Sequence, residues 1–358
     1  MRIAVIQRFL PSKSRGGAGH FTHGLCNALV DRGHQVTVFS QDSAPAGAKY
    51  SVVTLGHHSG WGRRYLAPLV FPFEVAKVDF SGFDVIHAQG DDHLLPRRGH
   101  TSWVRTLHGS AFAEAVHNGL RLGSIKRLLI HLYFYACEWI ASCRADRVVA
   151  VSKDTCRYYP RIHCVIPNGV DIGLFHPSKE VKSPHPSILF VGELNTRKRG
   201  RLLLKTVLQE IHPRLPEVEL WLVCAEETRG VGIRWFGAVD AERLSRLYRE
   251  AWVFCMPSSY EGFGRPYLEA MAAGTAVIAT INPGAMEVLD CGKYGLLVSE
   301  RDLGDALYTL LTQENMRQEY RRKGLERAKE YRWERVAEQY ESMYQEALHE
   351  RRTRQHAP

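Results

Sequence analysis

The sequence predicts an α/β protein built from two doubly wound parallel-sheet domains, and three observations lead to this prediction. The chain of 358 residues is too long for one domain of ordinary size and long enough for two full cores. Short apolar runs typical of buried parallel strands alternate with helix-forming segments in both halves. A turn signal, Asn168-Gly169, stands near the middle of the chain. We therefore expect domains at residues 1–168 and 169–332, with a last helix that belongs to the first domain.

The composition limits the possible binding partners of the protein and its cellular compartment. Hydrophobic residues make up 45% and charged residues 24%, the values of a soluble globular protein. The formal charge of +9 suits phosphorylated ligands, an anionic membrane or nucleic acid, but the basic residues are dispersed and we expect no nucleic-acid partner. Eight cysteines without a C-x-x-C pair indicate reduced thiols in a cytoplasmic protein. The N-terminal MRIAVIQRF does not read as a signal peptide, and the apolar stretch 128–141 is too short to span a bilayer.

The chain begins with a β-α-β unit. The pattern predicts a strand at 3–6, a glycine loop at 15–19, a helix over about 20–32 and a second strand at 35–40. The glycines do not complete a G-x-G-x-x-G fingerprint, and no acid follows the second strand to hold a ribose. A dinucleotide-dependent dehydrogenase is therefore disfavoured.

The rest of the first domain carries fewer signals. Residues 41–80 are rich in Gly, Pro, His and aromatic residues, and we expect irregular structure there. A buried strand at 84–88 is followed by Asp91 and Asp92, which we interpret as solvated loop carboxylates rather than metal ligands. The next strand ends at His108, at the edge where open α/β sheets place their binding sites.

The segment 125–144 is apolar nearly all round and has basic residues towards its ends. We favour a buried core helix. The alternative is a helix whose surface binds a membrane that carries a lipid-linked acceptor. Basic groups beside an apolar face favour binding to anionic lipid.

The second domain opens with a strand at 188–191, followed by three consecutive bases, Arg197-Lys198-Arg199. Fixed positive charge at the carboxyl end of a strand can neutralise a diphosphate leaving group without a metal ion. Further strands are predicted at 219–224 and 231–238.

The stretch 251–274 organises the second domain. An apolar strand leads into a loop with Gly262 and Gly264, and a helix then begins near Pro266 and stops at Gly274. Unpaired backbone N–H groups and the helix dipole at such a helix start favour phosphate. Two carboxylates, Glu261 and Glu269, frame this position.

The end of the chain is predicted to contain strands at 276–280 and 295–298, then two helices, the last over 333–348. The Arg-rich tail at 350–358 is expected to be disordered.

Four segments together resemble the retaining glycosyltransferases of family 4, also described as group 1, which have the GT-B fold. They are the E-x7-E text EGFGRPYLEAMAAG, the GG-x-G loop, T-x-H-G around His108, and IPNGVD-x-x-x-F-x-P from Ile166 to Pro177. The resemblance covers nearly the whole chain. It implies two Rossmann-like domains that face a central cleft and a C-terminal helix that crosses back to the N-terminal domain.

The resemblance also implies roles for particular residues. Arg197 and Lys198 would grip the donor diphosphate, Glu261 and His108 would position the sugar, and Glu269 would hold the ribose. The remaining donor-binding residues that it implies are Gly17, Gly262, Phe263, Gly264 and Arg265, with Arg234, Trp235 and Phe236 lining the base. Two departures stand out: Arg265 replaces a residue that is usually aliphatic, and Glu193 stands where many members have arginine.

The activity implied is transfer of a sugar, with retention of configuration, from a nucleotide-diphosphate sugar to a hydroxyl of a glycan or lipid-linked acceptor. A UDP-sugar is favoured over a GDP-sugar, and no metal or other cofactor is expected. The pathway would be cell-surface polysaccharide or lipopolysaccharide synthesis, in the cytoplasm or peripherally at the inner face of the cell membrane. Two alternatives stay open, a nucleotide-sugar epimerase of the same fold and a catalytically degenerate partner subunit, the latter because of Glu193.

Overall fold

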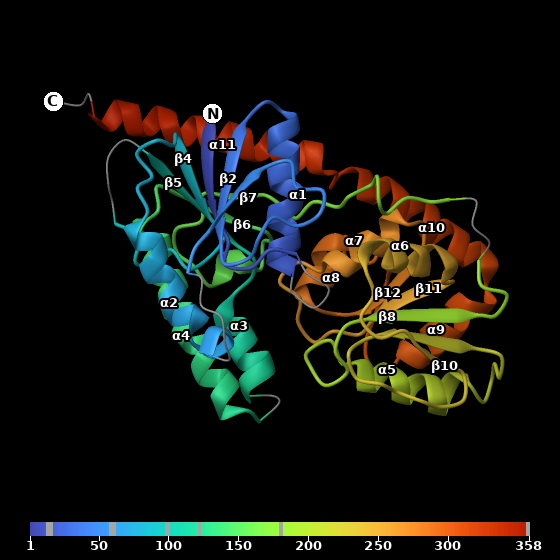
Figure 1. Cartoon of the computed structure of the whole chain (residues 1–358). Helices are drawn as coiled ribbons and strands as arrows, with labels where there is room; N and C mark the ends of the chain where they lie inside the picture. The colour runs from blue at the N-terminus through green and yellow to red at the C-terminus, as the bar shows by residue number, and fades with distance from the viewer. Residues whose placement is uncertain (12–16, 57–61, 97–100, 121–122, 179–181, 356–358) are drawn as a thin grey trace. The chain divides into compact units, whose positions relative to one another are not determined.

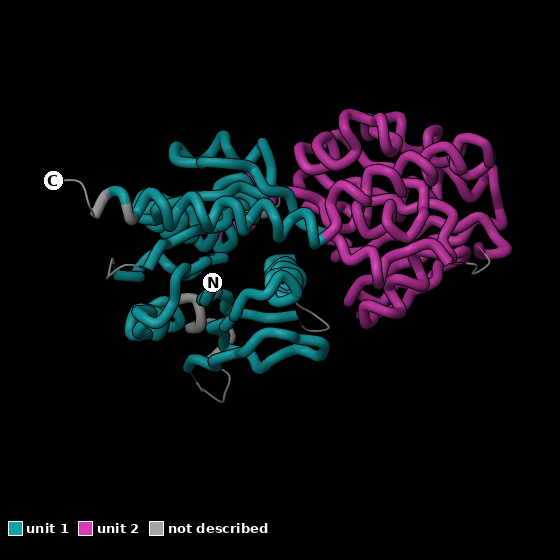
Figure 2. Tube along the Cα trace, turned by 90° about the horizontal axis from the view of Figure 1, so that it is seen from above, with its two compact units in different colours: residues 1–115, 126–169, 333–358 teal, residues 116–125, 170–332 magenta. Residues whose placement is uncertain are grey.

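The computed structural model describes residues 1–11, 17–56, 62–96, 101–120, 123–178 and 182–355 (Figure 1). The chain divides into two compact units (Figure 2). Residues 1–115, 126–169 and 333–358 form the first unit, and residues 116–125 and 170–332 form the second. Residues 116–125, which the sequence assigned to the first domain, thus group with the second unit.

The first unit is built on a seven-stranded sheet in the order β3-β2-β1-β4-β5-β6-β7, in which every pairing is parallel. The strands are β1 Arg2–Ile6, β2 Gln35–Ser40, β3 Ser51–Thr54, β4 Val85–Ala88, β5 Ser102–Leu107, β6 Arg147–Ala150 and β7 Cys164–Val165. The order reverses between β1 and β4, as it does in a doubly wound sheet.

The helices of this unit cover two apolar cores. They are α1 Gly17–Asp31, α2 Gly62–Lys77, α3 Ala111–Glu114, α4 Ile125–Arg144 and α11 Trp333–Gln355, with a 3-10 turn η2 at Thr155–Arg157. The π-helical turn η1 at Ala115–Leu120 begins in this unit, and its remaining residues group with the second unit. Side chains of α1 and α11 share one core with β1, while α2 and the end of α4 contribute to the other. The last helix therefore packs on the first unit, as expected.

Two predictions for this unit are wrong. Residues 41–80 contain β3, which pairs with β2, and α2, which buries Phe71 and Val75 completely. Tertiary burial thus outweighs the helix-breaking tendency of the two prolines, Pro68 and Pro72, in α2. The second error concerns the C-terminal tail: the last helix was expected to end at residue 348, whereas α11 continues to Gln355.

The second unit contains a six-stranded parallel sheet in the order β10-β9-β8-β11-β12-β13. Its strands are β8 Ser187–Val191, β9 Glu219–Val223, β10 Ile233–Trp235, β11 Val253–Met256, β12 Ala276–Thr280 and β13 Leu296–Val298. Its helices are α5 Gly200–Thr206, α6 Ala241–Glu250, α7 Arg265–Ala272, α8 Pro283–Val288, α9 Leu303–Thr312 and α10 Glu314–Lys329, with a π-helical turn η3 at Val207–Ile211. Three helices follow the last strand instead of the predicted two, counting α11.

Helix α4 is not a core helix. Of its residues, Ala141 and Ser142 are buried, whereas seven large apolar side chains are at least 38% exposed. These seven are Ile125, Leu129, Ile130, Leu132, Tyr133, Trp139 and Ile140. The prediction of a buried helix is therefore wrong, because the sheet covers only the end of this helix.

All eight cysteines are free thiols, as predicted. Within the described ranges, no helix is long and apolar enough to cross a membrane.

Candidate active site

The second sheet places two loops at the point where its strand order reverses. The chain moves outward from β8 to β9 and β10 on one side and then returns to β11 on the other, so β8 and β11 are neighbours. Open α/β sheets bind ligands at the carboxyl ends of strands flanking such a reversal. The loops in question are residues 193–199 after β8 and residues 257–264 after β11, which we call the basic loop and the donor loop.

An ion pair joins the two loops. Arg197 Nη1 lies 2.6 Å from Glu261 Oε1 and also donates a hydrogen bond of 2.9 Å to the carbonyl of Tyr260. Ser258 Oγ donates to the same carboxylate oxygen at 2.9 Å. Glu261 is only 5% exposed, so its orientation is set by these contacts. The structure thus brings together two residues that the sequence predicted for one site.

Lys198 lies beside this pair with its amine out of bulk water. Its Nζ donates to the carbonyl of Val191 at 3.2 Å. The stem of Lys198 packs so closely on Gly192 that a Cβ at Gly192 would collide with it. Burial lowers the pKa of the Lys198 amine, and the Glu261 carboxylate partly opposes this effect. An anion placed here would meet a positive charge with little competing water.

Arg199, the third of the consecutive bases, has a structural role. Its guanidinium donates to the carbonyl of Pro257 at 2.6 Å and to Thr280 Oγ1 at 3.0 Å, and it forms an ion pair with Glu300. It therefore fastens the donor loop to the ends of the neighbouring strands.

Helix α7 begins as the sequence predicted. Gly264 precedes it with φ +97°, a left-handed conformation that favours glycine, and Pro266 occupies its first turn. Arg265 Nη2 lies 2.8 Å from Glu269 Oε1, and Tyr248 donates to Glu269 Oε2 at 3.3 Å. The residue that departs from the family pattern thus pairs with the carboxylate predicted to hold the ribose.

Two more donor-loop residues that the resemblance assigns to donor binding are buried in the interior of the second unit. Gly262 is buried, and Phe263 is 3% exposed with its ring edge-on to Tyr331 at a centroid distance of 5.9 Å. Phe263 therefore anchors the loop by packing.

The residues predicted to line the base lie on the edge strand β10 and just after it. Arg234 pairs with Glu219 at 3.1 Å, and Trp235 Nε1 donates to the carbonyl of Cys224 at 3.0 Å. The Phe236 ring packs edge-on against Trp221. Strand β10 lies two positions from β8, a separation of about 10 Å at ordinary sheet spacing.

Two predicted residues lie in the first unit. Gly17 begins α1 after β1, whereas the preceding residues 15 and 16 of the predicted glycine loop lie outside the described residues. His108 follows β5; its Nε2 donates to Gln89 Oε1 at 2.6 Å, and its ring meets Phe21 edge-on at 4.8 Å. Gln89, just after β4, fixes the orientation of His108, and no motif in the sequence marks it.

A second histidine, His87, is completely buried behind His108. It hydrogen-bonds Thr106 Oγ1 at 2.8 Å and the Tyr344 hydroxyl at 2.6 Å. Burial, and then the charge of His108, lower the pKa of His87 to about 3. His87 is therefore neutral at physiological pH and ties α11 to the sheet.

The acidic pair after β4 is not solvated as predicted. Asp91 forms an ion pair of 2.8 Å with Arg8, while Asp92 is fully buried in an ion pair with Arg105 and accepts a hydrogen bond from Trp103 Nε1 at 3.0 Å. Within the part of the chain that the structure describes, no group of three His, Cys, Asp or Glu residues is arranged to hold a metal ion.

Comparison with known proteins gives the family. Residues 15–174 match the family profile described as "Glycosyltransferase Family 4", and residues 185–313 match "Glycosyl transferases group 1". The chain is 31% identical over 201 residues to a phosphatidyl-myo-inositol mannosyltransferase of Mycobacterium tuberculosis, covering 50% of this chain and 53% of that protein. It thus spans about half the length of that relative. It is 25% identical to a D-inositol 3-phosphate glycosyltransferase of Corynebacterium jeikeium over 97% of each chain.

Solved structures show the same fold. The sucrose-phosphate synthase of Thermosynechococcus elongatus superposes with a TM-score of 0.77 at 22% identity, covering 96% of this chain and 98% of that one. Anabaena HepE in complex with UDP-glucose superposes with a TM-score of 0.70 at 17% identity, covering 97% of this chain and 100% of that one. The predicted GT-B fold is thereby confirmed, and the chain belongs to the group 1 glycosyltransferases of family 4.

Proposed function

We propose that the protein transfers a sugar from a nucleotide-diphosphate sugar to a hydroxyl group, with retention of configuration and without a metal ion. The observation that carries this proposal is the placement of Arg197 and Lys198 against the donor loop at the strand-order reversal of the second sheet. Two fixed cations and the start of α7 offer the positive potential that a departing diphosphate requires.

The chemistry follows from charge development. The bond between the anomeric carbon and the phosphate oxygen breaks, the acceptor oxygen bonds to that carbon from the same face, and the acceptor proton passes to the leaving phosphate. Arg197 and Lys198 stabilise the growing negative charge, Glu261 and His108 position the sugar, and Glu269 holds the ribose. Each preorganised donor of this kind contributes about 3–4 kcal/mol, by analogy with single oxyanion-hole deletions.

A UDP-sugar is the donor that we favour over a GDP-sugar, because the structural neighbour HepE binds UDP-glucose. The test is thermal stability with UDP-, GDP-, ADP- and dTDP-sugars in the presence of EDTA, on the wild type, Glu269→Ala and the control Glu242→Ala, which alters an exposed residue of α6. A bound donor raises stability by about 2.7 kcal/mol at a hundredfold excess over its dissociation constant.

The outcomes separate the alternatives. A shift with one donor that is lost only in Glu269→Ala supports the donor site, and a shift that EDTA abolishes contradicts the metal-free proposal. Epimerised donor in the absence of an acceptor would identify an epimerase instead. No shift with any donor would favour a degenerate partner subunit.

The acceptor that we propose is lipid-linked and lies on an anionic membrane at which the protein acts peripherally, in cell-surface glycan or lipopolysaccharide synthesis. At 100° per residue, six of the seven exposed apolar residues of α4 fall within an arc of about 120°, all except Ile130. Lys126 and Arg127 stand at the start of the same helix. An exposed apolar face with basic residues beside it is typical of helices that bind anionic lipid surfaces.

Vesicle co-sedimentation tests this contact. We expect the wild type to bind vesicles of phosphatidylglycerol more strongly than vesicles of phosphatidylcholine, and the double variant Leu129→Ser, Ile140→Ser to lose binding. Leu208→Ser is the matched control, since Leu208 is 40% exposed in the second unit. Equal binding by the double variant and the control would rule out α4 as the membrane contact.

A further inference from the structure

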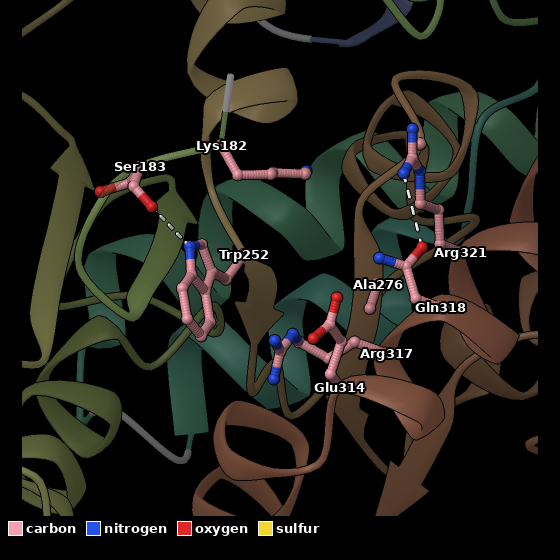
Figure 3. Close-up of a pocket in the computed structure, with 9 residues that line it drawn as sticks. Lys182, Ser183, Trp252, Ala276, Glu314, Arg317, Gln318 and Arg321 are labelled. Carbon is pink, nitrogen blue, oxygen red and sulfur yellow. Dashed lines mark hydrogen bonds between the residues drawn. The ribbon is translucent and has the colours of Figure 1, made fainter. Parts of the chain in front are cut away.

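A cavity of about 190 Å³ lies in the second unit, and Figure 3 shows the residues that line it. Trp252 comes just before β11 and Ala276 begins β12, and both line the cavity. The cavity therefore adjoins the amino ends of strands whose carboxyl ends lead to the donor loop and to α8. It is separate from the candidate active site.

The lining is strongly basic. Three cations, Lys182, Arg317 and Arg321, line it together with one carboxylate, Glu314. Arg317 and Arg321 are four residues apart on α10, a spacing at which like charges repel across one helical turn. Among the described residues, none of the three cations forms an ion pair with a carboxylate. The charge of Glu314 acts favourably on Arg317, but three positive charges share this one carboxylate. Their grouping therefore costs electrostatic free energy unless a further anion joins them.

The hydrogen bonds of these cations leave donors unused. Lys182 Nζ donates to the carbonyl of Ala251 at 2.7 Å and to Thr275 Oγ1 at 3.3 Å, which accounts for two of its three protons. Arg321 Nη1 reaches Gln318 Oε1 at 3.4 Å, while its Nε is buried and has no acceptor among the described residues. A buried N–H without an acceptor costs about 1–3 kcal/mol, so this site has a donor ready for a ligand oxygen.

Arg317 is held differently. Its Nη1 donates to the carbonyls of Leu310 at 3.1 Å and Leu311 at 2.6 Å, and its guanidinium carbon lies 4.3 Å from the centre of the Trp252 ring. The side chain is therefore preorganised by packing, as a binding cation must be if affinity is not to be lost in ordering it.

We propose that this cavity binds a tetrahedral oxyanion, inorganic phosphate or the phosphate group of a monoester, with Lys182, Arg317 and Arg321 as its binding residues. The volume accommodates such a group, and Trp252 offers an apolar wall for the remainder of a monoester. Burial, and then repulsion by Arg321 and Arg317, lower the pKa of the Lys182 amine to about 7. Glu314 is the carboxylate in the same lining. An anion among the three cations offsets that repulsion and favours the protonated form of the Lys182 amine. Its binding is therefore coupled to proton uptake by Lys182.

The experiment is isothermal titration calorimetry with sodium sulfate at constant ionic strength, since sulfate does not titrate near neutral pH. Wild type is compared with Arg321→Gln and with Arg322→Gln, the adjacent residue, which is exposed and pairs with Glu326. Lys198→Met removes a cation of the donor site instead. We expect Arg321→Gln to weaken sulfate binding by at least about tenfold, which is about 1.4 kcal/mol, and the other two variants to bind as the wild type does.

Three results would overturn the proposal: no sulfate binding by the wild type, undiminished binding by Arg321→Gln, or loss of binding in Lys198→Met, which would place the anion in the donor site. If Arg321→Gln does not fold, Lys182→Met takes its place, because it removes a charge that burial already disfavours. Repeating the titration with inorganic phosphate and glycerol 1-phosphate distinguishes the free ion from a monoester. Because these titrations measure anion binding directly, they need no donor and no transferase activity.

Discussion

Replacing Lys198 with methionine tests the role of fixed positive charge directly. Methionine keeps most of the volume that packs on Gly192 and removes the amine. Glu261 is not left unpaired, because Arg197 remains 2.6 Å from its carboxylate. The variant therefore removes one cation without leaving a buried carboxylate unpaired.

The magnitudes separate catalysis from stability. The variant loses the hydrogen bond to the carbonyl of Val191, about 1 kcal/mol, and gains a similar amount because a charge that burial disfavours is gone. We expect the free energy of unfolding to change by less than about 1 kcal/mol. Loss of a preorganised donor to the leaving group is expected to lower kcat by about 10²–10³.

The assay is release of nucleoside diphosphate from the donor that the thermal-shift panel identifies, with its affinity measured by calorimetry. Lys205→Met is the matched control, because Lys205 is exposed on α5. We expect kcat to fall more than donor affinity, since the charge develops during bond breaking. A kcat within about threefold of the wild type, with unchanged diphosphate affinity, would refute the placement of Lys198 at the diphosphate.

Three further predictions concern stability and the donor loop. The pKa of His87 lies near 3 in the folded protein, below its ordinary value of 6.5, so the unfolded chain binds a proton first as the pH falls and stability is lost between about pH 6.5 and 3. Urea unfolding at pH 7 and pH 5 should differ by about 2 kcal/mol more in the wild type than in His87→Gln. Asp92→Ala leaves its buried arginine partner unpaired and should cost about 3–5 kcal/mol in urea unfolding, against less than about 1 kcal/mol for the exposed Asp31→Ala; equal costs would contradict the importance of the buried pair. Gly284→Ala places a Cβ within 2.7 Å of two backbone carbonyls of the donor loop and should abolish the donor-induced thermal shift, whereas Gly304→Ala, which meets a movable Glu side chain, should retain it.

Much of the candidate site was predictable because its signals are local. A glycine in a left-handed turn, a proline in the first helical turn and a strand of apolar residues specify the segment from β11 through α7 with little help from distant residues. The bases after β8 were found in the same way. The family resemblance assigned Arg197 and Lys198, but not Arg199, to the diphosphate, and the structure shows that Arg199 fastens the donor loop.

The errors share one physical origin. Helix α4 was predicted to be buried because its residues are apolar, and Asp92 was predicted to be solvated because it is a loop carboxylate. Helix α2 was missed because residues 41–80 are rich in Gly, Pro, His and aromatic residues. Burial depends on which surfaces meet after the chain folds, and composition alone does not contain that information.

The sequence by itself determined the fold class, the alternation of strands and helices and the donor-loop motif, since these follow from side-chain period, backbone torsions and turn residues. Only the tertiary structure decided which charges are paired. It joined Arg197 to Glu261, Arg265 to Glu269 and Arg105 to Asp92, and it grouped Lys182 with Arg317 and Arg321 around a cavity. The reason is that electrostatic and packing free energies depend on distances between residues far apart in the chain, and folding sets those distances.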